Sequence, residues 1–269
     1  MINLPKLAVA ALAALAFNAA YAGTITDVYT GATGPGDLIG ASTYQISSAT
    51  ITRSLNVLTI AITTNFAGNA GTDTYNGVKI GYGDLFLSNA WNPSGTAATN
   101  YSTDNMATSN TIWKYGVSID SATARVTGGA QNTAVSLYQL NAPTGVSGAA
   151  AINAANIRTS TDIIGGTTSN YRAGQADQVK TTGSSSVLDT GKNGTLVSSA
   201  AGSNLLTFQI DITGTDMMNW TSFAMHWGET CQNDVIEGIT SVSVPEPAGL
   251  ALFGLGLVGL VAARRRKMI

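Results

Sequence analysis

The chain has 269 residues, of which 44% are hydrophobic and only 10% are charged, and it contains 30 glycines and 6 prolines. Five of its 13 basic residues but only one of its 15 acidic residues lie in the two terminal segments, so the body between them is acidic and lacks the basic surface that nucleic-acid binding requires. Cys231 is the single cysteine, which excludes an intramolecular disulfide and predicts a buried thiol.

The chain begins with the pattern of a secretory signal peptide. Lys6 supplies a positive charge, residues 7–17 form an apolar run, and Ala20 and Ala22 place small side chains at the −3 and −1 positions before Gly23. The apolar run is too short to span a bilayer permanently. We therefore expect residues 1–22 to engage the Sec export machinery and to be removed between Ala22 and Gly23.

Short segments in which apolar and polar residues alternate fill the body of the chain, and Gly, Asn, Asp and Ser clusters separate them. The predicted strands lie within 58–62, 78–80, 85–87, 112–119, 135–140, 205–212 and 223–227. Only 148–157 and 216–220 favour a short helix. These patterns predict an all-β fold, namely a single β-sandwich (jelly-roll-like) extracellular domain spanning residues 23–243.

Residues 226–238 hold the only histidine and the only cysteine of the chain, together with two glutamates and an aspartate. His226 and Cys231 are the residue types of a base and a nucleophile, or of zinc ligands. No third orienting group and no paired ligands accompany them, so we expect neither a catalytic residue nor a zinc centre here. The simplest interpretation makes Trp227 part of the core and Cys231 a buried thiol.

Asn233, Asp234 and Glu237 leave two interpretations open, which are calcium ligands or a structural turn. The D-x-[DN]-x-[DN]-G pattern of a calcium loop is missing around them. We therefore expect no cofactor, and calcium is the alternative that remains open.

A carbohydrate site is a further interpretation, with Asp84 accepting sugar hydroxyl hydrogens and Trp91 stacking on a sugar ring. Trp113 and Tyr115, by contrast, lie on an apolar strand face and are expected in the core. The chain lacks the G-x-S-x-G, P-loop and H-E-x-x-H patterns, and a single histidine excludes most catalytic triads. We therefore expect a protein that is not an enzyme.

The C-terminal segment 244–269 has three consecutive parts. Pro245, Glu246 and Pro247 form an extended, charged tripeptide, because proline disfavours helix on both sides of the glutamate. Residues 248–263 are uncharged and long enough for a short transmembrane helix. The basic tail 264–267, which comprises Arg264, Arg265, Arg266 and Lys267, is expected to stay in the cytoplasm.

This order of tripeptide, apolar run and arginine cluster resembles the PEP-CTERM sorting signal of Gram-negative bacteria. The resemblance covers about the last tenth of the chain, and residues 226–236 are similar to a segment that precedes the tail in many such proteins, from which Gly228 and Gln232 depart. The resemblance implies that an exosortase-type enzyme cleaves near Pro245–Pro247 and releases the body from the inner membrane to the cell surface or an exopolysaccharide matrix.

Together these expectations describe an exported surface or exopolysaccharide-matrix protein with a non-enzymatic structural or adhesive role. An extracellular carbohydrate- or calcium-binding module is the alternative, and an extracellular hydrolase is a further one. The expected partners are the Sec machinery, the exosortase-type enzyme, the inner membrane before processing, and exopolysaccharide.

Overall fold

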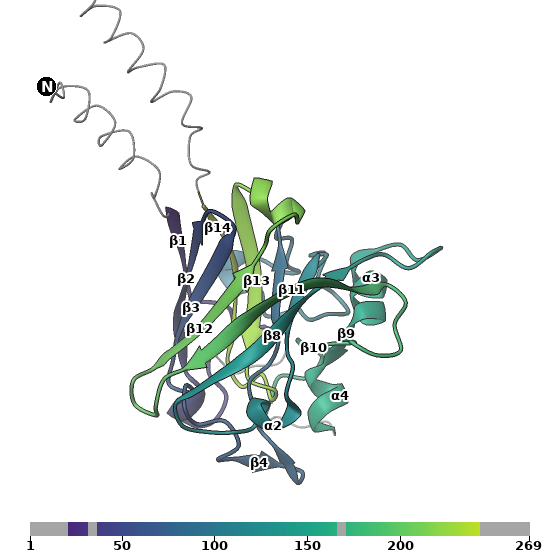
Figure 1. The fold of residues 1–269 in the computed structure, drawn as a ribbon. Coiled ribbons are helices and arrows are strands. Elements are labelled where there is room, and N and C mark those ends of the chain that lie inside the picture. Colours follow the sequence, from purple (N-terminus) through teal and green to yellow (C-terminus); the bar gives the residue numbers. More distant parts are fainter. Residues whose placement is uncertain (1–20, 32–36, 166–170, 243–269) are drawn as a thin grey trace, which may run out of the picture.

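The computed structural model describes residues 21–31, 37–165 and 171–242. Ten strands form one antiparallel sheet in the order β1-β2-β3-β12-β11-β8-β7-β6-β13-β14 (Figure 1). These strands are β1 (Tyr21–Thr26), β2 (Ile46–Ser54), β3 (Val57–Thr64), β6 (Leu85–Ser88), β7 (Tyr115–Ile119), β8 (Gln131–Leu140), β11 (Val187–Ser198), β12 (Leu205–Asp211), β13 (Ser222–Gly228) and β14 (Val235–Ser241). The all-β fold predicted from the alternating pattern is confirmed.

Smaller elements complete the fold. The hairpin β4–β5, the pair β9–β10 and several short helices lie outside the large sheet. Their bounds are β4 (Thr74–Tyr75), β5 (Val78–Lys79), β9 (Ile157–Thr159), β10 (Ala176–Val179), α2 (Ala122–Arg125), α3 (Ala149–Asn156), α4 (Ser160–Ile164), and the 3-10 helices η1 (Ser42–Tyr44), η2 (Ala97–Thr99) and η3 (Asp216–Asn219). The two short helices expected within 148–157 and 216–220 correspond to α3 and η3.

The large sheet nearly closes on itself, because its first and last strands lie against each other. A Cβ atom placed on Gly23 in β1 would lie 2.5 Å from the carbonyl oxygen of Ser241 in β14, and one on Gly238 would lie 2.9 Å from the Ile25 side chain. No ladder hydrogen bonds join these two strands within the described residues. We call this contact between β1 and β14 the seam.

The main core fills the inside of the curved sheet. In β12, Leu206, Phe208 and Ile210 are buried, and the neighbouring strand β3 pairs Ile62, Ile60 and Leu58 opposite them. Successive strand residues point to opposite faces, so the alternation in sequence becomes one apolar face and one wet face. The core expectation for Tyr115 and Trp227 is confirmed, because both are buried.

A second, smaller core lies on the outer face of β6, β7 and β13. It comprises Phe86, Trp113, Leu140, Ile157, Ala176, Val179 and Ala224. The pair β9–β10 and helix α3 contribute to this outer layer, and Figure 1 shows them on the right-hand side of the sheet. Trp113 is therefore buried as expected, although in the outer core and just before β7 rather than within a strand.

Within the described ranges, no helix is long and apolar enough to cross a membrane. The expected signal peptide, apart from its last two residues, and the expected transmembrane segment 248–263 both fall outside those ranges.

Candidate functional site

The hairpin formed by β13 and β14 carries the histidine–cysteine segment into the interior. Residues 223–238 are buried throughout, including the connection between the two strands. Cys231 packs in the main core, as predicted, and burial raises the pKa of its thiol well above the usual value. His226 instead packs beside Phe86 and Trp113 of the outer core. The two side chains therefore face different cores and do not form a nucleophile–base pair.

His226 forms a buried ion pair with Glu237 across the hairpin. Its Nδ1 lies 2.6 Å from Oε2 of Glu237, and its Nε2 lies 2.8 Å from the carbonyl oxygen of Ala176. A carbonyl oxygen only accepts, so Nε2 carries a proton, and one further proton lies between Nδ1 and the carboxylate. The other oxygen of Glu237 accepts a 2.7 Å hydrogen bond from the Trp91 indole. The pair thus connects the hairpin to β10 and to Trp91.

Asp84 forms a second buried ion pair and does not belong to a sugar site. Its Oδ1 lies 2.6 Å from the guanidinium of Arg125, and its two oxygens also accept from the backbone N–H groups of Ile119 and Val179. The side chain has no exposed area, so the expectation that Asp84 contacts a sugar is wrong. The apolar, strand-like sequence 85–87 does not indicate that Arg125 of α2 pairs with the preceding Asp84.

Three aspartates that lie far apart in sequence form an acidic cluster. Asp27 follows β1, Asp37 lies in the next connection, and Asp234 immediately precedes β14, and one carboxylate oxygen from each lies within 4.8 Å of the others. Burial and the neighbouring carboxylates raise the pKa of Asp27 to about 9 and that of Asp234 to about 7. Arg172, which is fully buried, donates to the backbone carbonyl of Asp37.

The residues expected to act together at 233–237 are thus divided between different neighbours. Asp234 joins the acidic cluster, Glu237 pairs with His226, and the backbone carbonyl of Asn233 accepts a 2.8 Å hydrogen bond from Ile39. Sequence reasoning missed Asp27 and Asp37 because no spacing motif relates them to Asp234. Only the closure of the sheet brings the two ends of the body together.

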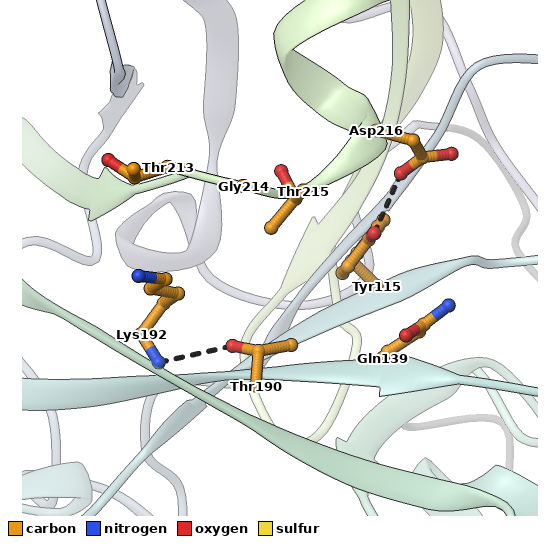
Figure 2. Close-up of a pocket in the computed structure, with 8 residues that line it drawn as sticks. All are labelled: Tyr115, Gln139, Thr190, Lys192, Thr213, Gly214, Thr215 and Asp216. Carbon is orange, nitrogen blue, oxygen red and sulfur yellow. Dashed lines mark hydrogen bonds between the residues drawn. The ribbon is translucent and has the colours of Figure 1, made fainter.

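A polar pocket of about 470 Å³ lies between the β8–β11 pair and the segment that follows β12, beside the main core to which its lining residue Tyr115 belongs. Its lining, drawn in Figure 2, is Tyr115, Gln139, Thr190, Lys192, Thr213, Gly214, Thr215 and Asp216. Tyr115 donates a 2.7 Å hydrogen bond to Asp216, and this contact together with burial raises the pKa of the tyrosine. The lining offers hydroxyl, amide and ammonium groups but only one carboxylate, so it lacks the paired carboxylates of a glycosidase.

Comparison with protein families identifies the C-terminal segment. A family model described as the PEP-CTERM protein-sorting motif matches residues 243–267. No match was found among the curated proteins or among the solved structures. The chain carries a PEP-CTERM sorting motif at residues 243–267, as the resemblance of Pro245–Pro247, the apolar run and the arginine cluster predicted.

The sorting residues themselves lie outside the described ranges, as do Ala20 and the basic tail. The motif implies an exported protein that is anchored in the membrane before an exosortase-type enzyme processes it. The described structure places the last residue before this region, Val242, directly after β14 and within the main core. The sorting signal therefore starts immediately where the packed body ends.

Proposed function

We propose that the processed body is a non-enzymatic structural or adhesive protein of the cell surface or exopolysaccharide matrix. The observation that carries this proposal is the PEP-CTERM motif at 243–267, which follows directly on a closely packed all-β body. The side chains that a hydrolase would use for catalysis also support the proposal of a non-enzymatic role, because they are buried and engaged with other groups. His226 and Asp84 are held in buried ion pairs, and Cys231 is a buried thiol.

Intact mass spectrometry of the protein recovered from the cell surface and medium tests the sorting part of the proposal. We expect a species that starts at Gly23 and ends near Pro245–Pro247, with any added surface group. A Glu246→Ala variant should accumulate as an unprocessed form, whereas Glu237→Gln, which alters a glutamate in the body, should still be processed if it folds. A wild-type species that retains Arg264–Ile269 would contradict processing.

The matrix role has a separate test. A strain that lacks the protein should release exopolysaccharide more readily under shear, and the wild-type chain should restore cohesion when it is re-expressed. A chain that lacks residues 243–269 should be exported without restoring cohesion. An unchanged matrix in the strain without the protein would contradict the structural role and leave the sorting result standing.

The polar pocket supports a second candidate, a carbohydrate-binding module. Lys192, Gln139 and the threonines that surround them can exchange hydrogen bonds with sugar hydroxyls, and the ammonium group suits an acidic sugar. Stacking contributes little, because Tyr115 is only 4% exposed. On a glycan array, Lys192→Ala should weaken binding of acidic glycans about tenfold, the effect of losing one charged hydrogen bond, and Lys79→Ala should not. Equal binding by both variants would contradict this candidate.

A further inference from the structure

The acidic cluster has the dimensions of a calcium site. A calcium ion holds oxygen ligands at 2.3–2.6 Å, so two oxygens on opposite sides of one ion are about 4.6–5.2 Å apart. The carboxylate oxygens of Asp27, Asp37 and Asp234 all lie within 4.8 Å of one another. A single ion can therefore contact all three without any movement of the backbone.

Two of the three carboxylates also have bonding capacity to spare, whereas both oxygens of Asp234 accept hydrogen bonds, from Gln45, Ile46 and Val235. Both oxygens of Asp27 are shielded from solvent and lack a donor in good hydrogen-bonding geometry within the described residues, although a contact with the backbone N–H of Tyr29 lowers the pKa of this carboxyl. Oδ1 of Asp37 is in the same condition, while its Oδ2 receives only a long contact of 3.4 Å from the Gln45 amide. Buried carboxylate oxygens without donors are costly, because they lose their hydration without replacement.

A fourth carboxyl group, outside the three aspartates, lies beside Asp234. Glu229 is completely buried, and its Oε2 accepts a hydrogen bond of 3.4 Å from the backbone N–H of Asp234. Its other oxygen, Oε1, has no hydrogen-bond partner in the part of the chain that the structure describes. A fully buried acid without a partner beside an acidic cluster is an independent sign that a cation belongs there.

The charges of the cluster leave room for a divalent ion. The three aspartates carry three negative charges when ionised, and the guanidinium of Arg172 interacts with all of them. Arg172 donates to the backbone carbonyl of Asp37, and its charge favours the ionised form of the Asp37 carboxyl. Two negative charges remain after this compensation, which is the charge that one divalent cation neutralises.

We propose that Asp27, Asp37 and Asp234 bind a calcium ion, with Glu229 as a supporting acid behind Asp234. Ligands that are all oxygen favour a hard cation, and a set without histidine or cysteine is unsuited to zinc. Millimolar calcium outside the cell matches the affinity range of extracellular calcium modules. The ion joins the end of β1 to the start of β14, so it fastens the seam that ladder hydrogen bonds leave open.

Calcium-dependent stability of the processed protein, or of the full-length chain in detergent, tests the site. Calcium at about 100 times its dissociation constant should raise the melting temperature by roughly 5–10 °C above the value in chelator. Terbium, a luminescent calcium substitute, should bind with one ion per chain, and calcium should displace it. Magnesium at the same concentration should have a smaller effect, because it demands a regular octahedral geometry.

Two variants locate the effect. Asp37→Asn should abolish most of the calcium-dependent shift, whereas Asp120→Asn, which alters an exposed aspartate after β7, should keep it. If Asp37→Asn does not fold, Asp27→Asn replaces it. An equal shift in the cluster variant and in Asp120→Asn would overturn the assignment to these residues. A wild-type protein that binds no terbium and melts at the same temperature with calcium and with chelator would overturn the proposal entirely.

Discussion

The two halves of the sheet achieve burial in different ways. Strand β12, in one half, buries Leu206, Phe208 and Ile210 and leaves Gln209 between them in solvent. Strand β13, in the other half, is buried at every position from Phe223 to Gly228. The difference arises because the outer core, with Ile157 and Val179, covers the second half, whereas the outer face of β12 meets water.

The buried ion pairs follow the same division, although Arg53 in β2 is also buried and donates to backbone carbonyl oxygens. The ion pairs Asp84–Arg125 and His226–Glu237 both lie in the covered half, together with the fully buried Asp177. Burial raises the pKa of Asp177 well above the usual range, and the charge of Arg125 opposes that rise. A strand with one wet face is stabilised mainly by apolar burial. A strand covered on both faces must also provide partners for every polar group that the second layer excludes from water.

A charge on the outer face gives the largest test of this comparison. Ala224→Glu places a carboxylate in the apolar outer core and should lower the free energy of unfolding by at least about 4 kcal/mol. Gln209→Glu, on the wet face of β12, should change it by less than about 0.5 kcal/mol. Urea unfolding of both variants measures this, and similar losses would mean that the two halves are not distinct.

Removal of one buried partner is the next largest test. Arg125→Met leaves the Asp84 carboxylate buried without its cation and should cost about 3–5 kcal/mol of unfolding free energy. Arg158→Met, which removes a guanidinium that hydrogen-bonds the exposed carbonyl of Asp162, should cost about 0–1 kcal/mol. Urea unfolding measures both losses of unfolding free energy. If Arg125→Met loses as little as Arg158→Met, another group compensates the buried charge of Asp84.

The two halves of the sheet meet at the seam. A substitution there should cost more stability than one on a solvent-exposed face but less than one in the core. A Cβ atom on Gly23 would lie 2.4 Å from Oγ1 of Thr240, so Gly23→Ala forces β1 and β14 apart and should cost about 1–3 kcal/mol. Thr24→Ala, the next position, has an exposed side chain and should change the unfolding free energy by less than about 0.5 kcal/mol. Thermal unfolding in chelator is the measurement. Equal melting temperatures for the two variants would argue against a tight seam.

The dependence of stability on pH is gradual, at most about 1.4 kcal/mol per pH unit for each group. The folded pKa values of Asp27, near 9, and of Asp234 and Asp104, near 7, exceed the ordinary value of 3.8, and burial is the largest cause for each. Asp37 and Arg172 face Asp27 and Asp234, the first raising and the second lowering their pKa.

The unfolded chain loses these protons near pH 4, while the folded protein keeps them. Their stabilising contribution is therefore complete below about pH 4 and is lost as the pH rises through about 7 and then 9. In chelator, the melting temperature should fall over this range. Calcium should oppose the fall most strongly at high pH, because metal binding replaces the protons. A melting temperature in chelator that rises from pH 5 to pH 9 would contradict this sign.

How far the sequence predicts the structure depends on which half is considered. The alternation in 58–62 and 205–212 identified β3 and β12, because one wet face leaves a pattern of period two. The segment 112–119 was only partly correct, since β7 begins at Tyr115 and Trp113 belongs to the outer core. The fully buried strand β6 is visible in the sequence only as a short apolar run. Arg125, which pairs with Asp84 just before this strand, has no sequence signal that relates it to Asp84.

The functional regions also differ in how far they can be predicted from the sequence. The sorting signal can be found from the sequence, because its parts are consecutive and an enzyme reads them in order. The pairing of His226 with Glu237 requires the register of a hairpin, in which these two residues are directly opposite. The cluster of Asp27, Asp37 and Asp234 requires the closure of the whole sheet, which no local pattern encodes.

The antiparallel seam also fixes which way the body points. Ser241, next to Gly23, lies at one end of β14, and Asp234 precedes its other end, about 20 Å away along the strand. Both ends of the processed body therefore leave from the same side, and a protein held through its C-terminal side has the acidic cluster at its far end. Neighbouring molecules held in this orientation would form a layer in which every buried acidic cluster lies on the side away from the attachment.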